Sequence, residues 1–423
     1  MTNSSKTTKL SSKYIVFISV CSALALVLRL MNFNHIARDY EVFLLPWFNK
    51  ISSLPGAQGI STPVGNYGIP YQVMIWLFTK LPVDPLYSYK ALSCVFDFVM
   101  AAGCFRLVYN TTRSQVRSCA AYAVALFLPT VIMNSSMWGQ CDSIFTAFII
   151  WSLAYFSEDR FRPAFIMLGF AFAFKLQAVF ILPFYGYEWF MRLSAAGKFT
   201  CQHKKTGSSQ KVTKATGFAP FSLLNILWLP AILYILSVPG FLCGRSLLDP
   251  ITIYTEQSDT YHYMYMNFPS FWQLFGSYDL YDVYHAPALA VTFSVLAIGL
   301  FLCVHTILKK SPEKLILTDR HTLLTIAAWT TWTVVLFLPA MHERYGYLPD
   351  LLLCLLACCE PIMIPFAVIA VTGSLLHYCY YLYGFGYYAD ESFWFYVALF
   401  YFAGWLLFTI MIVIKNKMVA KKK

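Results

Sequence analysis

An acidic side chain, Asp39, stands a few residues beyond the first long apolar segment, which ends near Met31. A carboxylate at the edge of a partly dry cavity can take a proton from a hydroxyl group, as a general base does. Asp39 could instead cap a helix that begins near Glu41. Because Glu41 is two residues away and would face another direction on a helix, Asp39 is the stronger candidate for a base.

Two cations interrupt or follow apolar segments further along the chain. Lys175 lies in the middle of the apolar stretch 161–187, and Arg344 follows the apolar segment 321–339. A lysine that faces lipid is costly, so Lys175 should face a cavity or extend to the membrane surface. The fork of an arginine matches phosphate oxygen atoms, and a lysine provides a compact charge. The alternative for Arg344 is a plain salt bridge to Glu343 or Asp39.

Other polar and aromatic side chains stand near the ends of apolar segments. Trp138 and Gln140 could provide an aromatic platform and a hydrogen bond to a sugar hydroxyl group, whereas Asp142 could equally stabilise a helix N-terminus. Each could be a solvated loop residue, but their convergence on one side of a membrane favours a site. We predict that His342 joins Arg344 and Lys175 at a phosphate, and that the substrate-binding residues are Trp138, Gln140, Asp142, Gln177, Tyr67, Tyr254, Gln257, Asn267, Glu343 and Tyr345.

Asp97 lies in the middle of the apolar segment 86–109. A carboxylate at the centre of a membrane helix costs about 2.5–3.5 kcal/mol on insertion scales. Lys90 is seven residues earlier on the same helical face and could partly offset this cost. Structural pairing and a functional role both remain open for Asp97.

Composition shows which elements must position these side chains. The chain has 423 residues, of which 59% are hydrophobic and only 12% are charged. Many apolar segments are long enough to cross a hydrocarbon core of about 30 Å. Backbone groups in lipid must be satisfied within the segment, which favours helices, and the alternating pattern of a β-barrel is absent. The sequence therefore predicts an all-α polytopic membrane protein.

The predicted single domain, residues 1–423, has about 12 transmembrane helices. A long outer loop, 32–84, would carry Asp39 and two interfacial helices, 42–54 and 69–81. The stretch 161–187 should form two short helices, 162–174 and 178–192, that meet at Lys175. The expected spans are 13–31, 86–109, 118–133, 141–156, the two short helices, 218–238, 286–308, 321–339, 346–359, 361–382 and 392–414. After the outer loop, residues 86–350 would form the rest of the core, and 361–414 would contain the least constrained spans.

The positive charge predicts orientation rather than nucleic-acid binding. The net charge is +11. If both termini and alternate loops lie inside, the inner segments, which include the basic loop 198–214, hold 23 of the 31 Lys and Arg residues but 6 of the 20 Asp and Glu residues. Basic loops stay on the cytoplasmic side. We therefore expect a plasma-membrane protein with cytoplasmic termini and a site on the extracytoplasmic side.

Five motifs appear in an order that is similar to a known family. The motifs are Arg38-Asp39-Tyr40 with Phe43 to Trp47, Trp138-Gly139-Gln140-Cys141-Asp142, Phe174-Lys175-Leu176-Gln177-Ala178, Leu248-Asp249 with Ile253-Tyr254 and Gln257, and Met341-His342-Glu343-Arg344-Tyr345. With this set the sequence resembles the bacterial GT-C superfamily glycosyltransferases related to the second mannosyltransferase of GPI-anchor synthesis, and the match runs from about residue 25 to residue 350.

This resemblance implies an inverting hexosyltransferase with a polyprenyl-phosphate-linked donor and a glycan or glycolipid acceptor of the cell envelope. It would make Asp39 the base and Lys175 or Arg344 the phosphate contacts, and it leaves the sugar, mannose-like or glucose-like, undefined. A single phosphate charge needs no divalent ion, so we expect no metal and no cofactor. A glycolipid flippase or transporter and a polysaccharide polymerase remain alternatives, because both would also use a polar cavity among membrane helices.

Overall fold

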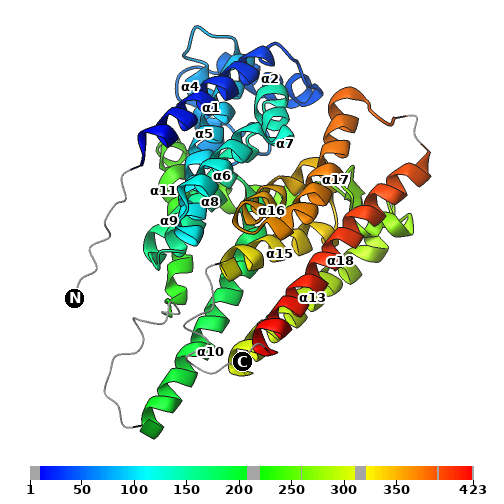
Figure 1. Cartoon of the computed structure of the whole chain (residues 1–423). Helices are drawn as coiled ribbons and strands as arrows, with labels where there is room; N and C mark the ends of the chain where they lie inside the picture. The colour runs from blue at the N-terminus through cyan, green and yellow to red at the C-terminus, as the bar shows by residue number, and fades with distance from the viewer. Residues whose placement is uncertain (1–9, 207–219, 259, 310–320, 388–389, 422–423) are drawn as a thin grey trace.

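The computed structural model describes residues 10–206, 220–258, 260–309, 321–387 and 390–421, and over these residues it is helical apart from turns, loops and one small sheet (Figure 1). Each predicted span contains a helix. The helices are α1 (Ser12–Met31), α5 (Pro85–Thr112), α6 (Gln115–Phe127), α8 (Asp142–Phe156), α9 (Phe161–Phe174), α10 (Leu182–Thr206), α11 (Trp228–Leu242), α13 (Tyr281–Lys309), α15 (His321–Phe337), α16 (Tyr347–Cys359), α17 (Ile364–Tyr383) and α18 (Glu391–Lys421).

Several of these helices have the length and composition of membrane spans. Within the described residues, six apolar helical segments are long enough to cross a bilayer, and a bent pair of helices makes a possible seventh. The prediction of an all-α polytopic membrane protein is therefore confirmed in its class. Of the remaining helices of the predicted set, α8, α9 and α15 are shorter apolar helices.

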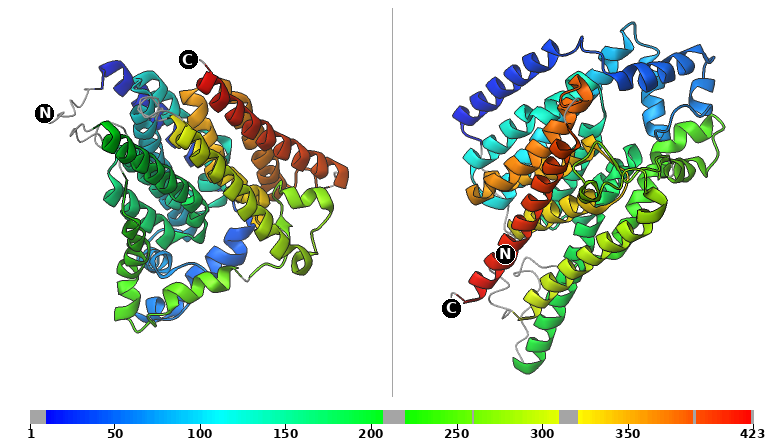
Figure 2. Two further views of the ribbon diagram at one scale, coloured as in Figure 1. Left: turned by 90° about the horizontal axis from the view of Figure 1, so that it is seen from below. Right: turned by 90° about the vertical axis from the view of Figure 1, so that its right-hand side faces the viewer.

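The helices pack in two groups that meet along α16. The first group contains α1, α5, α6, α8, α9 and α11, and the second contains α10, α13, α15, α17 and α18 (Figures 1 and 2). α8 and α16 are buried on nearly every side, as expected for helices that are apolar around their whole circumference. Gly169 lets α9 approach α11, because a Cβ atom there would lie 2.6 Å from the carbonyl oxygen of Trp228. The two groups together form the frame that surrounds the polar loops.

The first outer loop is largely helical. A π-helical turn (Tyr40–Leu44) leads into α2 (Leu45–Ser53), and α3 (Gln58–Ser61) and α4 (Ile69–Phe78) follow. The two helices predicted for 42–54 and 69–81 are therefore present. In Figure 1 these helices cluster above the first group, beyond the end of α1.

A helix break at Leu128 corrects one prediction. The predicted spans 118–133 and 141–156 leave 134–140 as a turn between them, but the chain is helical from α7 (Pro129–Ile132) through a π-helical segment (Met133–Trp138), bent by 46° from α6. Pro129 explains the break, because a proline holds its preceding residue out of the helical region and then suits the first position of a new helix. Helix residues therefore lead directly to Trp138.

A second break falls at Lys175, as predicted. Lys175 has an extended backbone (φ −154°, ψ 133°) between α9 and a 3₁₀ segment (Leu176–Ile181). The predicted second helix, 178–192, had the wrong limits, because α10 begins at Leu182 and continues to Thr206. The beginning of the expected basic loop 198–214 is therefore helical, since lysine is a good helix former, and the rest lies outside the described residues.

A two-stranded parallel sheet, absent from the sequence-based prediction, connects distant loops. β1 (Tyr265–Met266) pairs with β2 (Met341–His342), with Tyr265 opposite Met341. β1 lies between α12 (Asp249–Ser258) and a 3₁₀ turn (Phe271–Phe275). Asn267 directly after β1 and Ala340 directly before β2 both have positive φ angles, 52° and 57°. Such strained positions are frequent at functional sites.

Asp97 has a structural partner other than the predicted one. Its carboxylate accepts hydrogen bonds from Arg29 at 2.7 Å and from Ser135 at 2.6 Å, and all three side chains are fully buried. The predicted offset by Lys90 is wrong, because the Lys90 ammonium group instead binds the backbone carbonyl groups of residues 32, 33 and 35 at the end of α1. A lysine side chain can extend well beyond its own helical face. Arg29 and Lys90 thus fasten α1, which delivers Asp39.

We expect Arg29→Met to lower the free energy of unfolding by about 3 kcal/mol, because it leaves the buried Asp97 carboxylate without its counterion. Thermal unfolding of the purified protein in detergent measures this loss. Adding Asp97→Leu should recover most of it, and Arg38→Met, at an exposed cation, should change little. An Arg29→Met protein as stable as the wild type would contradict the role of this pair.

Candidate active site

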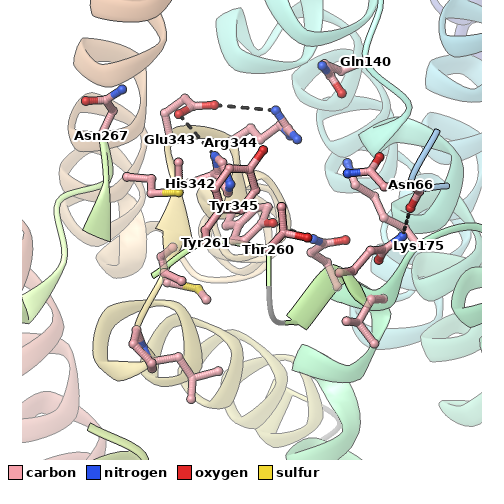
Figure 3. Close-up of a pocket in the computed structure, with 18 of the residues that line it drawn as sticks. Asn66, Gln140, Lys175, Thr260, Tyr261, Asn267, His342, Glu343, Arg344 and Tyr345 are labelled. Carbon is pink, nitrogen blue, oxygen red and sulfur yellow. Dashed lines mark hydrogen bonds and ion pairs between the residues drawn. The ribbon is translucent and has the colours of Figure 1, made fainter. Parts of the chain in front are cut away.

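Helix ends from both groups converge on one cavity of about 460 Å³. Asp39 follows α1, Gln140 precedes α8, Lys175 follows α9 and Arg344 lies between α15 and α16. Figure 3 shows Lys175, Gln140 and the segment 342–345 around this space. Of the predicted site residues, the cavity is lined by Asp39, Tyr67, Gln140, Lys175, Gln177, Gln257, Asn267, His342, Glu343, Arg344 and Tyr345.

Asp39 is held by hydrogen bonds on both carboxylate oxygen atoms. Oδ2 accepts from the Trp138 indole Nε1 at 3.0 Å and from the Gln140 amide Nε2 at 2.6 Å. Oδ1 accepts from the Tyr381 hydroxyl group, and the Asp39 side chain, which lines the cavity, is 12% exposed. Asp39 is therefore presented to the cavity in a fixed orientation.

The Asp39 side chain does not act as a helix cap. Asp39 precedes the π-helical turn that begins at Tyr40, but its carboxylate makes no capping hydrogen bond there. Glu41, the weaker candidate for a base, is exposed and does not line the cavity.

Lys175 and Asp142 form a buried ion pair. The Lys175 ammonium group donates to Asp142 Oδ1, and both side chains are at least 95% buried. Asp142 is the first residue of α8, and its Oδ2 accepts from Asn134 at 2.8 Å. Asp142 therefore serves both as a helix-end carboxylate and as the partner that holds Lys175 at the cavity.

Arg344 lies among three carboxylates. Its guanidinium nitrogen atoms lie 3.5 Å from Asp39 Oδ2, 3.6 Å from Glu343 Oε1 and 3.7 Å from Asp142 Oδ2. Burial opposes the positive charge, but Tyr67 and these carboxylates together hold the pKa of Arg344 well above its ordinary value. The buried Nε atom has no hydrogen-bond acceptor within the described residues. Arg344 is thus a permanent cation that lines the cavity and forms the expected salt bridges to Glu343 and Asp39.

The remaining lining residues form a hydrogen-bonded rim. Gln177 donates to the Tyr345 hydroxyl group at 2.7 Å, and burial raises the pKa of Tyr345 to about 12. The Tyr67 hydroxyl group lies 3.3 Å from Gln140 Oε1. Gln257 donates to the backbone carbonyl group of Asn66 and so joins α12 to the first outer loop.

Aromatic rings extend this rim towards β1. The His342 ring lies 4.8 Å from Tyr261 and 5.2 Å from Tyr345, measured between ring centroids. Asn267, which follows β1, lines the same side of the cavity. Flat rings beside amide groups are suited to binding a sugar.

Three predicted residues lie behind the lining rather than in it. Trp138 binds Asp39 and Asp142 binds Lys175, so these two residues hold the lining side chains from behind. Tyr254 stands apart, because its hydroxyl group donates to the backbone carbonyl group of Phe172 and fixes α12 against α9.

Tyr381 is a site residue that the sequence-based prediction missed, as it also missed the lining residues Thr260, Tyr261, Tyr281 and His285. It lies near the end of α17, lines the cavity and bonds to Asp39. It belongs to the region 361–414, where the resemblance to a known family offered no motif. Its only sequence signal was a polar ring at the end of a predicted span.

Apolar side chains form another part of the cavity wall. The 3₁₀ segment after Lys175 contributes Leu176, Val179 and Phe180, and α13 contributes Leu289 across the space. Within the described residues, no group of three or more His, Cys, Asp or Glu side chains is arranged to hold a metal ion. The cavity therefore combines two cations, one oriented carboxylate and an apolar wall.

These features define a membrane-embedded polar cavity suited to transfer chemistry, and a comparison with known families identifies its class. The sequence model of glycosyltransferase family 87 matches residues 66–197. The chain is a glycosyltransferase, an enzyme that takes a sugar donor and an acceptor. The matched region contains Gln140, Lys175 and Gln177, whereas Asp39 and Arg344 lie outside it. No curated protein matches the chain.

Proposed function

We propose that this glycosyltransferase moves a hexose, mannose-like or glucose-like, from a polyprenyl-phosphate carrier to a glycan or glycolipid of the cell envelope, with inversion at the anomeric carbon. The observation that carries the proposal is the meeting of Asp39, Arg344 and Lys175 at one cavity. An acid–base group and two cations at one substrate-sized space match the needs of a phosphate leaving group and a hydroxyl nucleophile.

The wall composition supports a lipid-linked donor. The apolar residues Val179, Phe180 and Leu289 lie in the same cavity as the two cations. A polyprenyl chain could lie along the apolar part while its phosphate meets the guanidinium group of Arg344 and the ammonium group of Lys175. His342 lies in the same loop as Arg344 and would adjoin the phosphate.

In the proposed step, a proton transfer accompanies the formation of one bond and the cleavage of another at the anomeric carbon. Asp39 takes the proton of the acceptor hydroxyl group, and the oxygen of that group attacks the anomeric carbon. The bond from this carbon to the phosphate oxygen breaks, and polyprenyl phosphate leaves with the electron pair. Arg344 and Lys175 stabilise the charge that develops on the phosphate. Attack opposite the leaving group inverts the anomeric configuration, and no group of the step requires a metal or cofactor.

We further propose that the cavity opens on the extracytoplasmic side, with both termini and the basic loops in the cytoplasm. The positive-inside pattern of the sequence supports this orientation. The arrangement of about 12 crossings would place the C-terminal ends of α1, α9, α15 and α17 on the outer side, and these ends all adjoin the cavity.

The test uses the purified protein in sealed vesicles whose orientation is known. Polyprenyl-phosphate mannose and polyprenyl-phosphate glucose, labelled in the sugar, are offered with candidate glycan acceptors that cannot cross the membrane. We expect release of polyprenyl phosphate and a product of inverted configuration only when the extracytoplasmic face is accessible. The Asp39→Asn protein serves as the matched control for non-enzymatic release.

Other outcomes would contradict the proposal in distinct ways. Labelled lipid that crosses the bilayer unchanged would favour a flippase. Transfer from a nucleotide sugar alone would refute the lipid-linked donor. A product made only from lipid-linked oligosaccharides would favour a polymerase, and activity at the cytoplasmic face would refute the orientation.

A further inference from the structure

The two oxygen atoms of Asp39 have different surroundings. Oδ2 accepts from Trp138 and Gln140, and the Arg344 guanidinium group approaches the same atom at 3.5 Å. Oδ1 has a single donor among the described side chains, the hydroxyl group of Tyr381. A carboxylate oxygen can accept more than one hydrogen bond. Oδ1 is therefore the atom with room for an acceptor hydroxyl group.

The position of Tyr381 is fixed by packing. Its ring stacks on Trp138, with ring centroids 4.4 Å apart and an interplanar angle of 17°. One turn earlier on α17, Tyr378 contacts the edge of Trp138 and accepts a hydrogen bond from Asn134. α17 is thus joined to the π-helical segment that carries Trp138. The Tyr381 hydroxyl group cannot turn away from Asp39 without breaking this stack.

We propose that Tyr381 is a positioning residue that directs the Oδ1 lone pair of Asp39 towards the acceptor hydroxyl group. Tyr381 occupies one acceptor direction of Oδ1 and leaves the other open to the cavity that both residues line. The inference rests on the proposed function of Asp39, and it assigns a role to α17, which lies outside the matched region 66–197.

The charged groups around Asp39 come from several elements. They are Arg344, Glu343 and His342 from the loop before α16, the paired Lys175 and Asp142 from α9 and α8, and Tyr67 from the first outer loop. Because a Phe substitution at Tyr381 changes none of these groups, its effect on the carboxylate can be assigned to the lost hydroxyl donor.

The test compares Tyr381→Phe with the wild type. Phenylalanine keeps the stack on Trp138 but removes the donor to Oδ1. We expect kcat to fall by roughly tenfold to a hundredfold, with the donor KM unchanged. The acid limb of the pH–rate profile should move to higher pH, because the loss of a donor disfavours the charged carboxylate. Tyr383→Phe is the matched control, since Tyr383 is exposed and its hydroxyl group contacts Met137 rather than Asp39.

A titration without substrate separates this inference from the proposed function. Infrared spectra of protein labelled with ¹³C in the aspartate carboxyl groups, with the Asp39→Asn spectrum subtracted, report protonation of Asp39 alone. In Tyr381→Phe the carboxylate should protonate at higher pH than in the wild type. An unchanged titration or an unmoved acid limb overturns the role of Tyr381. If Tyr381→Phe shifts the titration of Asp39 as expected but the wild-type protein transfers no sugar from any lipid carrier, only the proposed function is overturned.

Discussion

Asp39→Asn is expected to reduce sugar transfer by roughly 10²–10⁴-fold, the range that general-base catalysis contributes. Asparagine has nearly the same shape as aspartate and can still accept from Trp138 and Gln140, so the cavity wall should persist. It cannot take the proton of an acceptor hydroxyl group. The measurement is the rate of polyprenyl phosphate release at saturating donor and acceptor.

The control for this variant separates catalysis from folding. The Asp39→Asn protein should keep the thermal stability of the wild type and its affinity for the donor, because the phosphate contacts are untouched. Glu41→Gln, at the exposed neighbouring acid, should leave the rate unchanged. Wild-type turnover in Asp39→Asn would show that another group accepts the proton.

Arg344→Ala is expected to reduce kcat/KM for the lipid donor by roughly 10²–10³-fold, the usual loss when a preorganised donor to a developing negative charge is removed. Most of the loss should appear as a higher donor KM, because the guanidinium group would hold the phosphate in the ground state as well. Initial rates over a range of donor concentrations at fixed acceptor separate the two parameters.

A conservative substitution sharpens the interpretation of Arg344. Arg344→Lys keeps one positive charge among Asp39, Asp142 and Glu343 but loses the fork, so it should recover only part of the loss. If Arg344→Ala retained the donor KM of the wild type, the arginine would be a structural counterion and not a phosphate contact.

The sequence predicted the helices and the break at Lys175 for a simple reason. An apolar segment of about 20 residues is long enough to cross the membrane as a helix, and a lysine within such a segment must face a cavity or extend to the membrane surface. Asp39 and Arg344 were predictable because each follows an apolar segment, and Lys175 was predictable because it interrupts one. In the structure these three residues line one cavity.

Other features depended on contacts that sequence spacing does not encode. The partner of Asp97 is Arg29 from another helix, although Lys90 had the better spacing on its own helix. Tyr254 stood beside promising residues, yet its hydroxyl group binds a helix carbonyl group. Tyr381 reaches Asp39 only because α17 packs against Trp138. The backbone pairing of two residues at β1 and β2 is likewise too short to produce an alternating pattern.

That small sheet also joins two stretches of chain through backbone hydrogen bonds. The amide of Ala340 donates to the carbonyl group of Met264 at 3.0 Å, and Met266 is paired with His342 two residues before Arg344. A shift of the segment around Met264 would therefore be transmitted through backbone bonds to the arginine. If the donor is the proposed polyprenyl-phosphate sugar, contacts of its headgroup with this segment and with Arg344 would be linked through these backbone hydrogen bonds.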